Sequence, residues 1–512
     1  MDPDARTATT STHRTTVDGV PARWADLTTD PTTTLAFGVG IRDLDPTTAG
    51  ITHLVEHLVM RRVGRVRYPV NAESSLGSTS FYVTGTPAQT TEFLGLVCDA
   101  VRDLAVNGVG DADLEAERRT VLAEIGQDGL YGAPDPLSHR YGPRGPGAAV
   151  ASHLRLLDWR ADEVLEVVRR WFHAGNAVLT STRPLPADLR LDLPAPVRGN
   201  RRAEPDPVLT GRAWTFHPAE LNLSGVVGAR HDRAGVELAR AVLSDALMES
   251  TRTATGDVYS VEVGAVALAS GTLVLVDLDP QPDRTGAVVG TAVATLDRLA
   301  HEGPSTELLD GARETLASEL SLGAVQASLL DTVAAHELRG IRLLDAAELT
   351  GALGAVTADQ VRDVLADVAT SLLVSVPGGV PVDARTERTL TDAGIRPERQ
   401  HDPGPPAGVG RVFRGRVFGP ARGMSVVVHD EAIVLRGDGP DRVVRAADVV
   451  LAGTDGDGDL ELVTESGCAY LVAPSLFRGL ARPLAAWVGR LPEPLRYVKS
   501  RPGEPAAMAA EA

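Results

Sequence analysis

Apolar residues follow two alternating spacings along the first part of the chain. Residues 35–44 and 80–87 carry the short apolar runs of strands. Residues 51–62, 91–106 and 111–126 carry apolar side chains three and four positions apart, the spacing of a helix that is buried on one side. Strands and helices that alternate in this way predict a mixed α/β layer structure.

The pattern returns farther along the chain, in two segments. Residues 228–247 resemble the strand-and-helix unit at 40–61, and residues 299–319 resemble 104–124 without a gap. Chance similarity between helices rich in alanine and leucine would explain either pair alone. Because both pairs keep their order, the sequence favours an internal duplication.

Two Pro-rich stretches divide the chain and suggest a domain plan. The expected fold class is α+β, with two homologous mixed α/β halves and a small C-terminal antiparallel β domain that ends in a helix. The element order of this small domain is similar to that of a PH-type barrel. The expected segments are a disordered N-terminus (1–14), a first half (15–190), a linker (191–208), a second half (209–400), a second linker (401–410), the β domain (411–498) and a loose tail (499–512).

Composition and charge narrow the classes of protein to which the chain can belong. The formal net charge is −18, which argues against nonspecific binding to nucleic acid. No apolar run approaches the ~18 residues of a membrane span, and the polar N-terminus lacks the apolar core of a secretory signal. Cys98 and Cys468 lie far apart and suggest no disulfide framework. We therefore expect a cytoplasmic protein, with the Arg-rich and Ala-rich composition of a GC-rich bacterial genome.

The predicted helix at 51–62 carries a group of polar residues that could bind a metal. His53 and His57 are four positions apart and therefore lie on one side of the helix, and imidazole is a common zinc ligand. Glu56 lies on the same side, within reach of a water at the metal. The alternative is an accidental H-x-x-E-H pattern on a polar helix surface.

A zinc site that keeps one position open for water needs a third protein ligand. The predicted helix at 111–126 offers Glu117 and Glu124, which lie two turns apart on one side, next to an apolar stripe. A carboxylate beside such a stripe needs a partner, because burying it alone is costly. Ordinary salt bridges are the alternative for both glutamates.

The second copy of the repeat lacks this polar group. When Gly50 is aligned with Gly235, Leu238, Ala241 and Val242 fall opposite the two histidines and the glutamate. Apolar residues therefore fit these helix positions, and the fold does not require polar ones. This difference between the copies indicates that the polar group of the first copy serves chemistry.

H-x-x-E-H is the inverzincin signature, and over residues 15–400 the chain resembles the M16 family of zinc peptidases. That family includes pitrilysin, insulin-degrading enzyme and the mitochondrial processing peptidase, and the chain is most similar to its short bacterial M16B-type subunits. The family has a duplicated α/β half with an active first copy and a degenerate second one. The resemblance implies that His53, His57 and Glu124 bind Zn²⁺, that Glu56 is the catalytic base and that Glu117 supports the ligands.

Two further motifs rest on the same resemblance. Asn71 and Ala72 match the Asn-Ala stretch that, in the family, contacts the substrate backbone beside an edge strand, which we expect near 78–83. A plain turn before a strand is the alternative. Arg252 and Tyr259 match an Arg/Tyr pair that the family's second half supplies to the substrate. A helix-surface arginine and a strand tyrosine are the alternative.

The spacing between the ligands departs from the family pattern. His57 and Glu124 are 67 positions apart, roughly ten fewer than is usual for H-x-x-E-H ligands of this family. The equivalent residues of the second copy, Val242 and Glu319, are 77 apart. We therefore expect a loss of about ten residues in the first copy, between Met60 and Asn71.

The function that the resemblance implies is a zinc endopeptidase for short or unfolded peptides, with trimming of a leader from a peptide as one such role. The expected assembly is a homodimer, with a heterodimer with an M16-like paralogue as the next option. The alternative function is that of a non-catalytic partner or scaffold subunit that binds peptides. Such subunits typically lose the zinc-binding residues, which this chain keeps.

Overall fold

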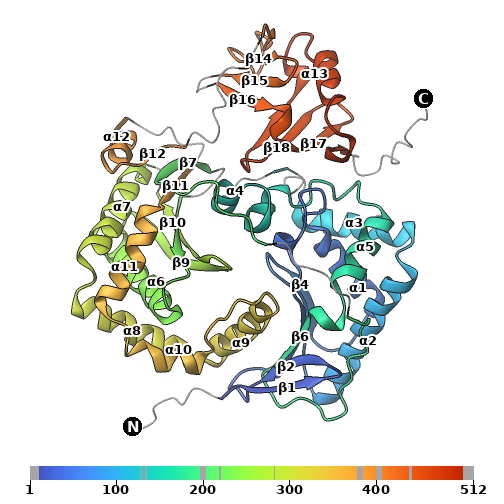
Figure 1. The fold of residues 1–512 in the computed structure, drawn as a ribbon, viewed down its shortest axis with the longest axis vertical. Helices are drawn as coiled ribbons and strands as arrows, with labels where there is room; N and C mark the ends of the chain where they lie inside the picture. The colour runs from blue at the N-terminus through green and yellow to red at the C-terminus, as the bar shows by residue number, and fades with distance from the viewer. Residues whose placement is uncertain are drawn as a thin grey trace.

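The fold is described from a computed structural model of the chain (Figure 1). The described residues are 11–126, 129, 131–132, 135–196, 203–217, 221–281, 283–377, 384–398, 406, 408–437 and 441–499. The predicted loose tail after Lys499 and most of the predicted N-terminal and second linker segments lie outside these ranges. No helix in the described part of the chain has both the length and the apolar character needed to cross a membrane.

The first half is a six-stranded sheet covered by helices on one face. Its strand order is β1-β2-β6-β3-β5-β4, so β4 is an edge strand. The strands are β1 (His13–Val17), β2 (Val20–Trp24), β3 (Thr32–Phe37), β4 (Val70–Ser74), β5 (Thr79–Thr84) and β6 (Ala177–Ser181). The helices are α1 (Ile51–Val63), α2 (Pro87–Asn107), α3 (Asp111–Ile125), α4 (Pro136–Tyr141) and α5 (Ala161–Trp171), with short 3₁₀ turns η1 (Ile41–Asp43), η3 (Gly145–Ala151) and η4 (Ala174–Asn176).

The core of the first half lies between the sheet and these helices. Leu35 and Phe37 of β3 and Phe81 of β5 are fully buried against α1 and α2. Successive strand residues point to opposite faces, so the intervening residues of β3 and β5 face away from the helices. This opposite face is turned toward the second half of the molecule.

The second half repeats this architecture. Its strand order is β12-β7-β11-β8-β10-β9, and its parallel and antiparallel pairings follow the first sheet from β7 to β9. The strands are β7 (Ala213–His217), β8 (Leu221–Gly228), β9 (Val258–Leu268), β10 (Gly271–Pro280), β11 (Leu373–Pro377) and β12 (Arg396–Pro397). The helices are α6 (Arg233–Leu247), the π-helical turn η5 (Met248–Thr253), α7 (Thr285–Glu302), α8 (Thr306–Leu320), α9 (Gly323–Glu337), α10 (Ala346–Leu353), α11 (Ala358–Thr370) and α12 (Ala384–Asp392). The predicted duplication and fold class are confirmed.

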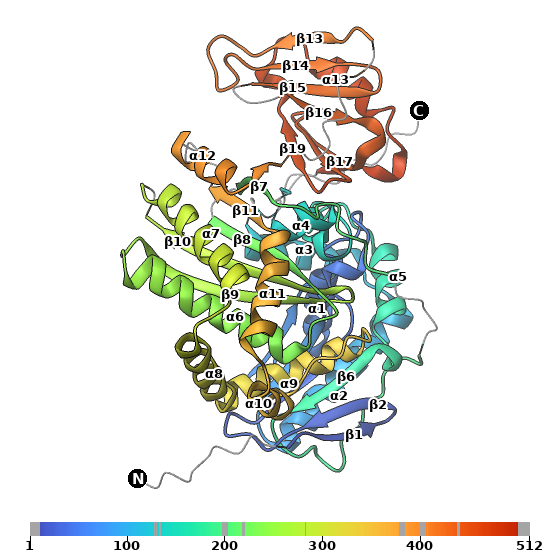
Figure 2. The same ribbon diagram turned by 60° about the vertical axis from the view of Figure 1, so that its left-hand side comes forward.

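The C-terminal part forms a small β domain that rests on the first half (Figure 2). Its two four-stranded sheets have the orders β13-β14-β15-β16 and β19-β18-β17-β20. The elements are β13 (Arg411–Arg414), β14 (Ser425–Val428), β15 (Ala432–Arg436), β16 (Arg442–Arg445), β17 (Val449–Asp455), β18 (Leu460–Thr464), β19 (Ala469–Val472), α13 (Ala481–Val488) and β20 (Arg496–Lys499), with short 3₁₀ turns η6 (Ala446–Asp448), η7 (Pro474–Leu476) and η8 (Glu493–Leu495). β20 follows the helix and pairs parallel to β17, so the helix does not end the domain as the sequence predicted.

Several predicted boundaries are wrong for identifiable reasons. β1 begins at His13, within the segment expected to be disordered. The linker residues Leu191 and Leu193 are buried in the core of the first half, so this part of the predicted linker belongs to that half. The expected edge strand near 78–83 is β5, an interior strand, because the polar segment 70–74 pairs outside it as β4.

Helix α9 of the second half packs across the open face of the first sheet. Arg339, just after α9, binds Asp43 of the first half through its guanidinium and also donates to the carbonyl oxygen of Gly77. Asp331 of α9 accepts hydrogen bonds from Thr34 of β3, at 3.4 Å, and from Thr180 of β6. These polar contacts hold the two halves of one chain together.

Candidate metal centre

Helix α1 carries His53, Glu56 and His57 on a side that packs toward α3 and β4. Ile51, Leu54 and Leu58 are fully buried and fix the opposite side of the helix in the core. Glycines at both ends, Gly50 and Gly64, adopt positive φ angles that other residues disfavour. The helix therefore begins two residues before His53, and its buried side fixes the rotation at which it presents both histidines.

Helix α3 brings Glu124 to the two histidines. Glu124 Oε1 lies 3.5 Å from His53 Nε2, and its Oε2 lies 3.2 Å from His57 Nε2. Ligand atoms of the three residues lie within 4.8 Å of one another. Atoms bound about 2.0–2.1 Å from one tetrahedral zinc lie about 3.3 Å apart. The two nitrogens and the carboxylate thus fit a zinc ion with an open fourth position.

Glu117 supports one of these histidines from the side. Its Oε2 lies 3.4 Å from His57 Nδ1, and its Oε1 accepts a hydrogen bond of 2.9 Å from Arg61. Arg61 in turn binds Asp113 at 2.9 Å. A carboxylate at the second nitrogen of a histidine fixes the ring's orientation and leaves Nε2 for a metal, so the contact fits the supporting role predicted for Glu117.

His153 is a neighbour of the site that sequence reasoning missed. Its Nε2 lies 3.0 Å from His53 Nδ1, and burial, reinforced by the neighbouring His53, lowers the pKa of His153 to about 4. Burial and the adjacent His57 also lower the pKa of His53, although Glu124 opposes this. No spacing rule marks His153, because it lies 100 positions from His53 in an irregular segment.

Glu56 is buried beside the two histidines. Burial, together with the negative charges of Glu124 and Glu73, raises the pKa of Glu56 to about 7. The backbone N–H of Ser74 on β4 donates a hydrogen bond to the carboxylate and opposes this shift. A carboxylate with such a pKa can take up and release a proton near neutral pH.

The edge strand β4 runs beside the candidate metal centre and contains Asn71 and Ala72. Its residues pair with β5 from Val70 with Val83 to Ser74 with Thr79. Hydrogen bonds alternate in an antiparallel ladder, and the Ser74 N–H points away from β5 toward Glu56. Ala72 therefore presents its backbone groups at the same outer edge, whereas the side chain of Asn71 donates to Tyr82 Oη at 3.2 Å.

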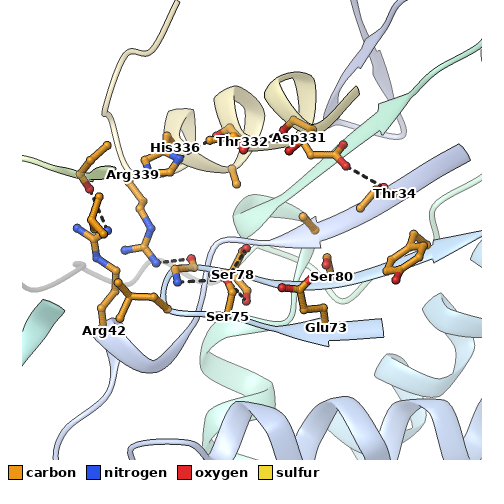
Figure 3. A pocket seen from close by; sticks show the side chains of 18 of the residues that line it. Thr34, Arg42, Glu73, Ser75, Ser78, Ser80, Asp331, Thr332, His336 and Arg339 are labelled. Atoms are coloured by element: carbon orange, nitrogen blue, oxygen red, sulfur yellow. Dashed lines mark hydrogen bonds between the residues drawn. The ribbon is translucent and has the colours of Figure 1, made fainter. Parts of the chain in front are cut away.

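A polar cavity of about 580 Å³ lies on the other face of the same strands. Figure 3 shows Glu73 and Ser80 on the sheet and Asp331 and Thr332 on α9 across the cavity. Burial raises the pKa of Asp331, although its two threonine donors oppose the shift. The sheet therefore lies between the cavity and the candidate metal centre.

Arg252 and Tyr259 lie in the other half of the chain. The guanidinium carbon of Arg252, on η5, lies 6.0 Å from the ring centroid of Tyr259, the second residue of β9, which is 77% exposed. Among the described residues, no hydrogen bond or ion pair joins either residue to the metal centre of the same chain. In Figure 1, β9 and α1 lie in different lobes.

The second copy has a helix pair of the same form without the site. Leu238 and Val242 of α6 are fully buried in the second core, and α6 packs against α8 as α1 packs against α3. Glu319 of α8 occupies the position of Glu124 and is exposed. The two helix pairs therefore differ mainly in side chains.

The expected shortening lies mostly elsewhere than predicted. From Gly50 to the start of β4 there are 20 positions, and from Gly235 to the start of β9 there are 23. The hairpin β4–β5 spans 15 residues (70–84), whereas β9–β10 spans 23 (258–280). The prediction that the loss lies between Met60 and Asn71 is wrong, because the shorter hairpin supplies most of the difference.

Comparison with known proteins adds structural but not sequence relatives. No protein-family model matches the chain, and no curated protein matches it. A protease from Helicobacter pylori superposes with a TM-score of 0.57 at 15% identity, over 72% of this chain and 100% of that protein. An inactive M16 peptidase domain from Pseudomonas fluorescens gives 0.55 at 15% identity, over 72% and 98%.

A third neighbour is the first half of the periplasmic protease PqqL from Escherichia coli, with a TM-score of 0.53 at 13% identity, over 75% of this chain and 96% of that one. At such identities the likeness establishes architecture alone, and an inactive domain shares it. The two homologous halves of this chain have the fold of the M16 peptidases.

Proposed function

We propose that the chain is a zinc-dependent endopeptidase with its active site on α1 and α3. The observation that carries the proposal is the convergence of His53, His57 and Glu124 within 4.8 Å, with Glu56 beside them. These residues come from a motif and a second helix 67 positions away. Their arrangement fits the ligand set and open position of a catalytic zinc site.

The chain's own residues would divide the work at this centre. Zinc held there would supply a Lewis acid that polarises a peptide carbonyl and lowers the pKa of a water toward about 7. Glu56 would accept a proton from the attacking water and give it to the leaving amine. Glu117 would hold His57 in the orientation that leaves Nε2 free.

The edge of β4 offers a place for an extended peptide. A substrate strand that paired with Ala72 would continue the sheet past the metal centre through backbone hydrogen bonds. Its side chains would point alternately to the helix side and to the cavity that contains Glu73. Because backbone pairing needs an extended chain, short or unfolded peptides are the substrates that fit, and leader trimming is one role of this kind.

Arg252 and Tyr259 would act from a second chain. They lie in the half that does not carry the metal residues, and Tyr259 is exposed. In a homodimer, a second copy would present this pair to the substrate, where a guanidinium and a phenol can stabilise the oxyanion. In a heterodimer with a paralogue, only one of the two metal centres would need to be complete.

The proposed location of the protein is the cytoplasm.

The test is cleavage of a mixed peptide pool by the purified protein with zinc, read by mass spectrometry. The expected result is a set of products from the wild-type chain and none from Glu56→Gln, which should still bind zinc. Zinc binding by both proteins with no products from either would instead support the non-catalytic, peptide-binding alternative. An inactive M16 domain with the same fold gives that alternative its weight.

A further inference from the structure

His153 makes a direct contact with the metal centre that the proposed function leaves without a role. The Nε2 atom of His153 lies 3.0 Å from His53 Nδ1, and its Nδ1 lies 2.8 Å from Ser152 Oγ. The two rings meet edge to face, with centroids 5.2 Å apart. The three side chains thus form a line that leads away from Glu124.

The direction of these hydrogen bonds follows from the ligand geometry. A neutral imidazole has one N–H donor and one acceptor nitrogen. His53 faces Glu124 through Nε2, so a metal there would require that nitrogen's lone pair and leave the proton on Nδ1. His53 Nδ1 would then donate to His153 Nε2, and His153 Nδ1 would donate to Ser152 Oγ.

We infer that His153 is a positioning residue, which accepts the Nδ1 proton of His53 and so holds that ring in the tautomer and orientation that bind zinc. The inference rests on the proposed function. It makes the two zinc-binding histidines unequal. His57 is supported by the carboxylate of Glu117, at 3.4 Å, whereas His53 is supported by a neutral ring.

The backbone around His153 is shaped for this contact. His153 has a φ of +63°, which residues other than glycine seldom adopt, and its N–H donates to the carbonyl oxygen of Ala49 at 3.1 Å. A Cβ atom on Gly50 would lie 2.8 Å from His153 N and 2.9 Å from Ser152 Oγ. The start of α1 and the His153 segment are therefore fitted to each other.

The C-terminal β domain holds this segment from the other side. Val150, Ala151 and Leu154 are buried in one cluster with Val450 and Leu451 of β17. The segment that positions His153 is thus clamped between α1 and the β domain. The β domain is therefore connected to the metal centre through this segment and through Ala49, which precedes α1 and lies in the same cluster.

The experiment measures the zinc affinity of the full-length protein by competition with a chromophoric chelator. His153→Leu removes the acceptor, and we expect it to weaken zinc binding by roughly 10–100-fold. His153→Gln supplies an amide oxygen at a similar reach, and we expect it to recover most of that loss. His173→Leu is the matched control, because His173 is also buried and, among the described residues, its side chain hydrogen-bonds only the carbonyl oxygen of Arg170.

The outcomes separate this inference from the proposed function. A wild-type chain that does not bind zinc would overturn the proposed function. If the wild type binds zinc and His153→Leu binds it as tightly as His173→Leu, the role of His153 is overturned and the peptidase proposal stands. If His153→Leu does not fold, His153→Asn replaces it, since asparagine tolerates the positive φ and its side chain is one bond shorter than that of glutamine. A zinc affinity of His153→Asn equal to that of the wild type would then overturn the inference.

Discussion

The two halves of the molecule share the order of five strands and a pair of packed helices, yet within the described residues only the first half brings candidate metal ligands together. In the first half, α1 presents two histidines and a glutamate beside Glu124 of α3. In the second, α6 fills the corresponding positions with Leu238, Ala241 and Val242. The fold therefore accepts an apolar helix at that place.

The comparison also distinguishes helix positions that pack in a core from helix positions whose side chains make polar contacts. Buried side chains of the second helix pair contribute to packing, because Leu238 and Val242 are fully buried. Their counterparts in the first half make polar contacts instead, His57 with Glu117 at 3.4 Å and His53 with His153 at 3.0 Å. Each position can thus be tested by giving one half the side chain of the other.

The largest expected effect comes from the third ligand and its counterpart. Glu124→Ala should lower peptidase activity by at least about 10³-fold, because a ligand and several kcal/mol of charge stabilisation at zinc are lost. Glu319→Ala is the matched control and should leave activity within about twofold, because exposed residues away from a site have small effects. An equal loss of peptidase activity in both variants would contradict the proposed difference between the halves.

Giving the second half a histidine should destabilise it. Leu238 is fully buried in an apolar core, so Leu238→His would lose packing and bury a polar ring without a designed partner, at about 2–4 kcal/mol in the free energy of unfolding. Urea unfolding measures this. A variant as stable as the wild type would mean that the second helix pair accommodates polar side chains as readily as the first.

Tyr259 allows a test of whether the second half of one chain acts at the metal centre of another chain. Tyr259→Phe should lower activity by about 10²-fold, as the loss of one oxyanion donor does. An equal mixture of re-associated Glu56→Gln and Tyr259→Phe chains should regain about a quarter of wild-type activity, because half the symmetric dimers are mixed and each has one complete site. A mixture no more active than its components would contradict action from the second copy.

The smallest expected effect is on the metal-free fold. His53→Leu with His57→Val gives α1 the residues of α6, and the free energy of unfolding without metal should change by no more than about 1 kcal/mol. The reason is that the fold already accepts these side chains in the second half. Calorimetry in the presence of a chelator measures this, and a loss of several kcal/mol would show that the histidines are structural.

The sequence predicted the elements whose pattern is strong and regular. Buried apolar spacing marked α1 and α3, and their bounds agree closely with the prediction. Helix α2 begins at Pro87, four residues earlier than expected, because Thr86 and Gln89 form a capping box there. The sequence missed β4, because VNAES is short and contains Asn and Glu, residue types that are depleted in strands.

The candidate centre was accessible to the sequence only in part. Histidines four apart share a helix face, and carboxylates two turns apart on a second helix share another, so periodicity could pair them. The contact of His153 with His53 depends on an irregular segment with a positive φ and on a close fit at Gly50. Contacts of this kind arise from tertiary packing and leave no periodic trace.

The zinc content of the protein after dialysis against buffered zinc decides whether α1 and α3 form a metal centre. The wild-type chain and the variant carrying His53→Leu and His57→Val would be compared by inductively coupled plasma mass spectrometry. We expect one zinc per wild-type chain and none in the variant. Equal zinc in both proteins, or none in either, would contradict it.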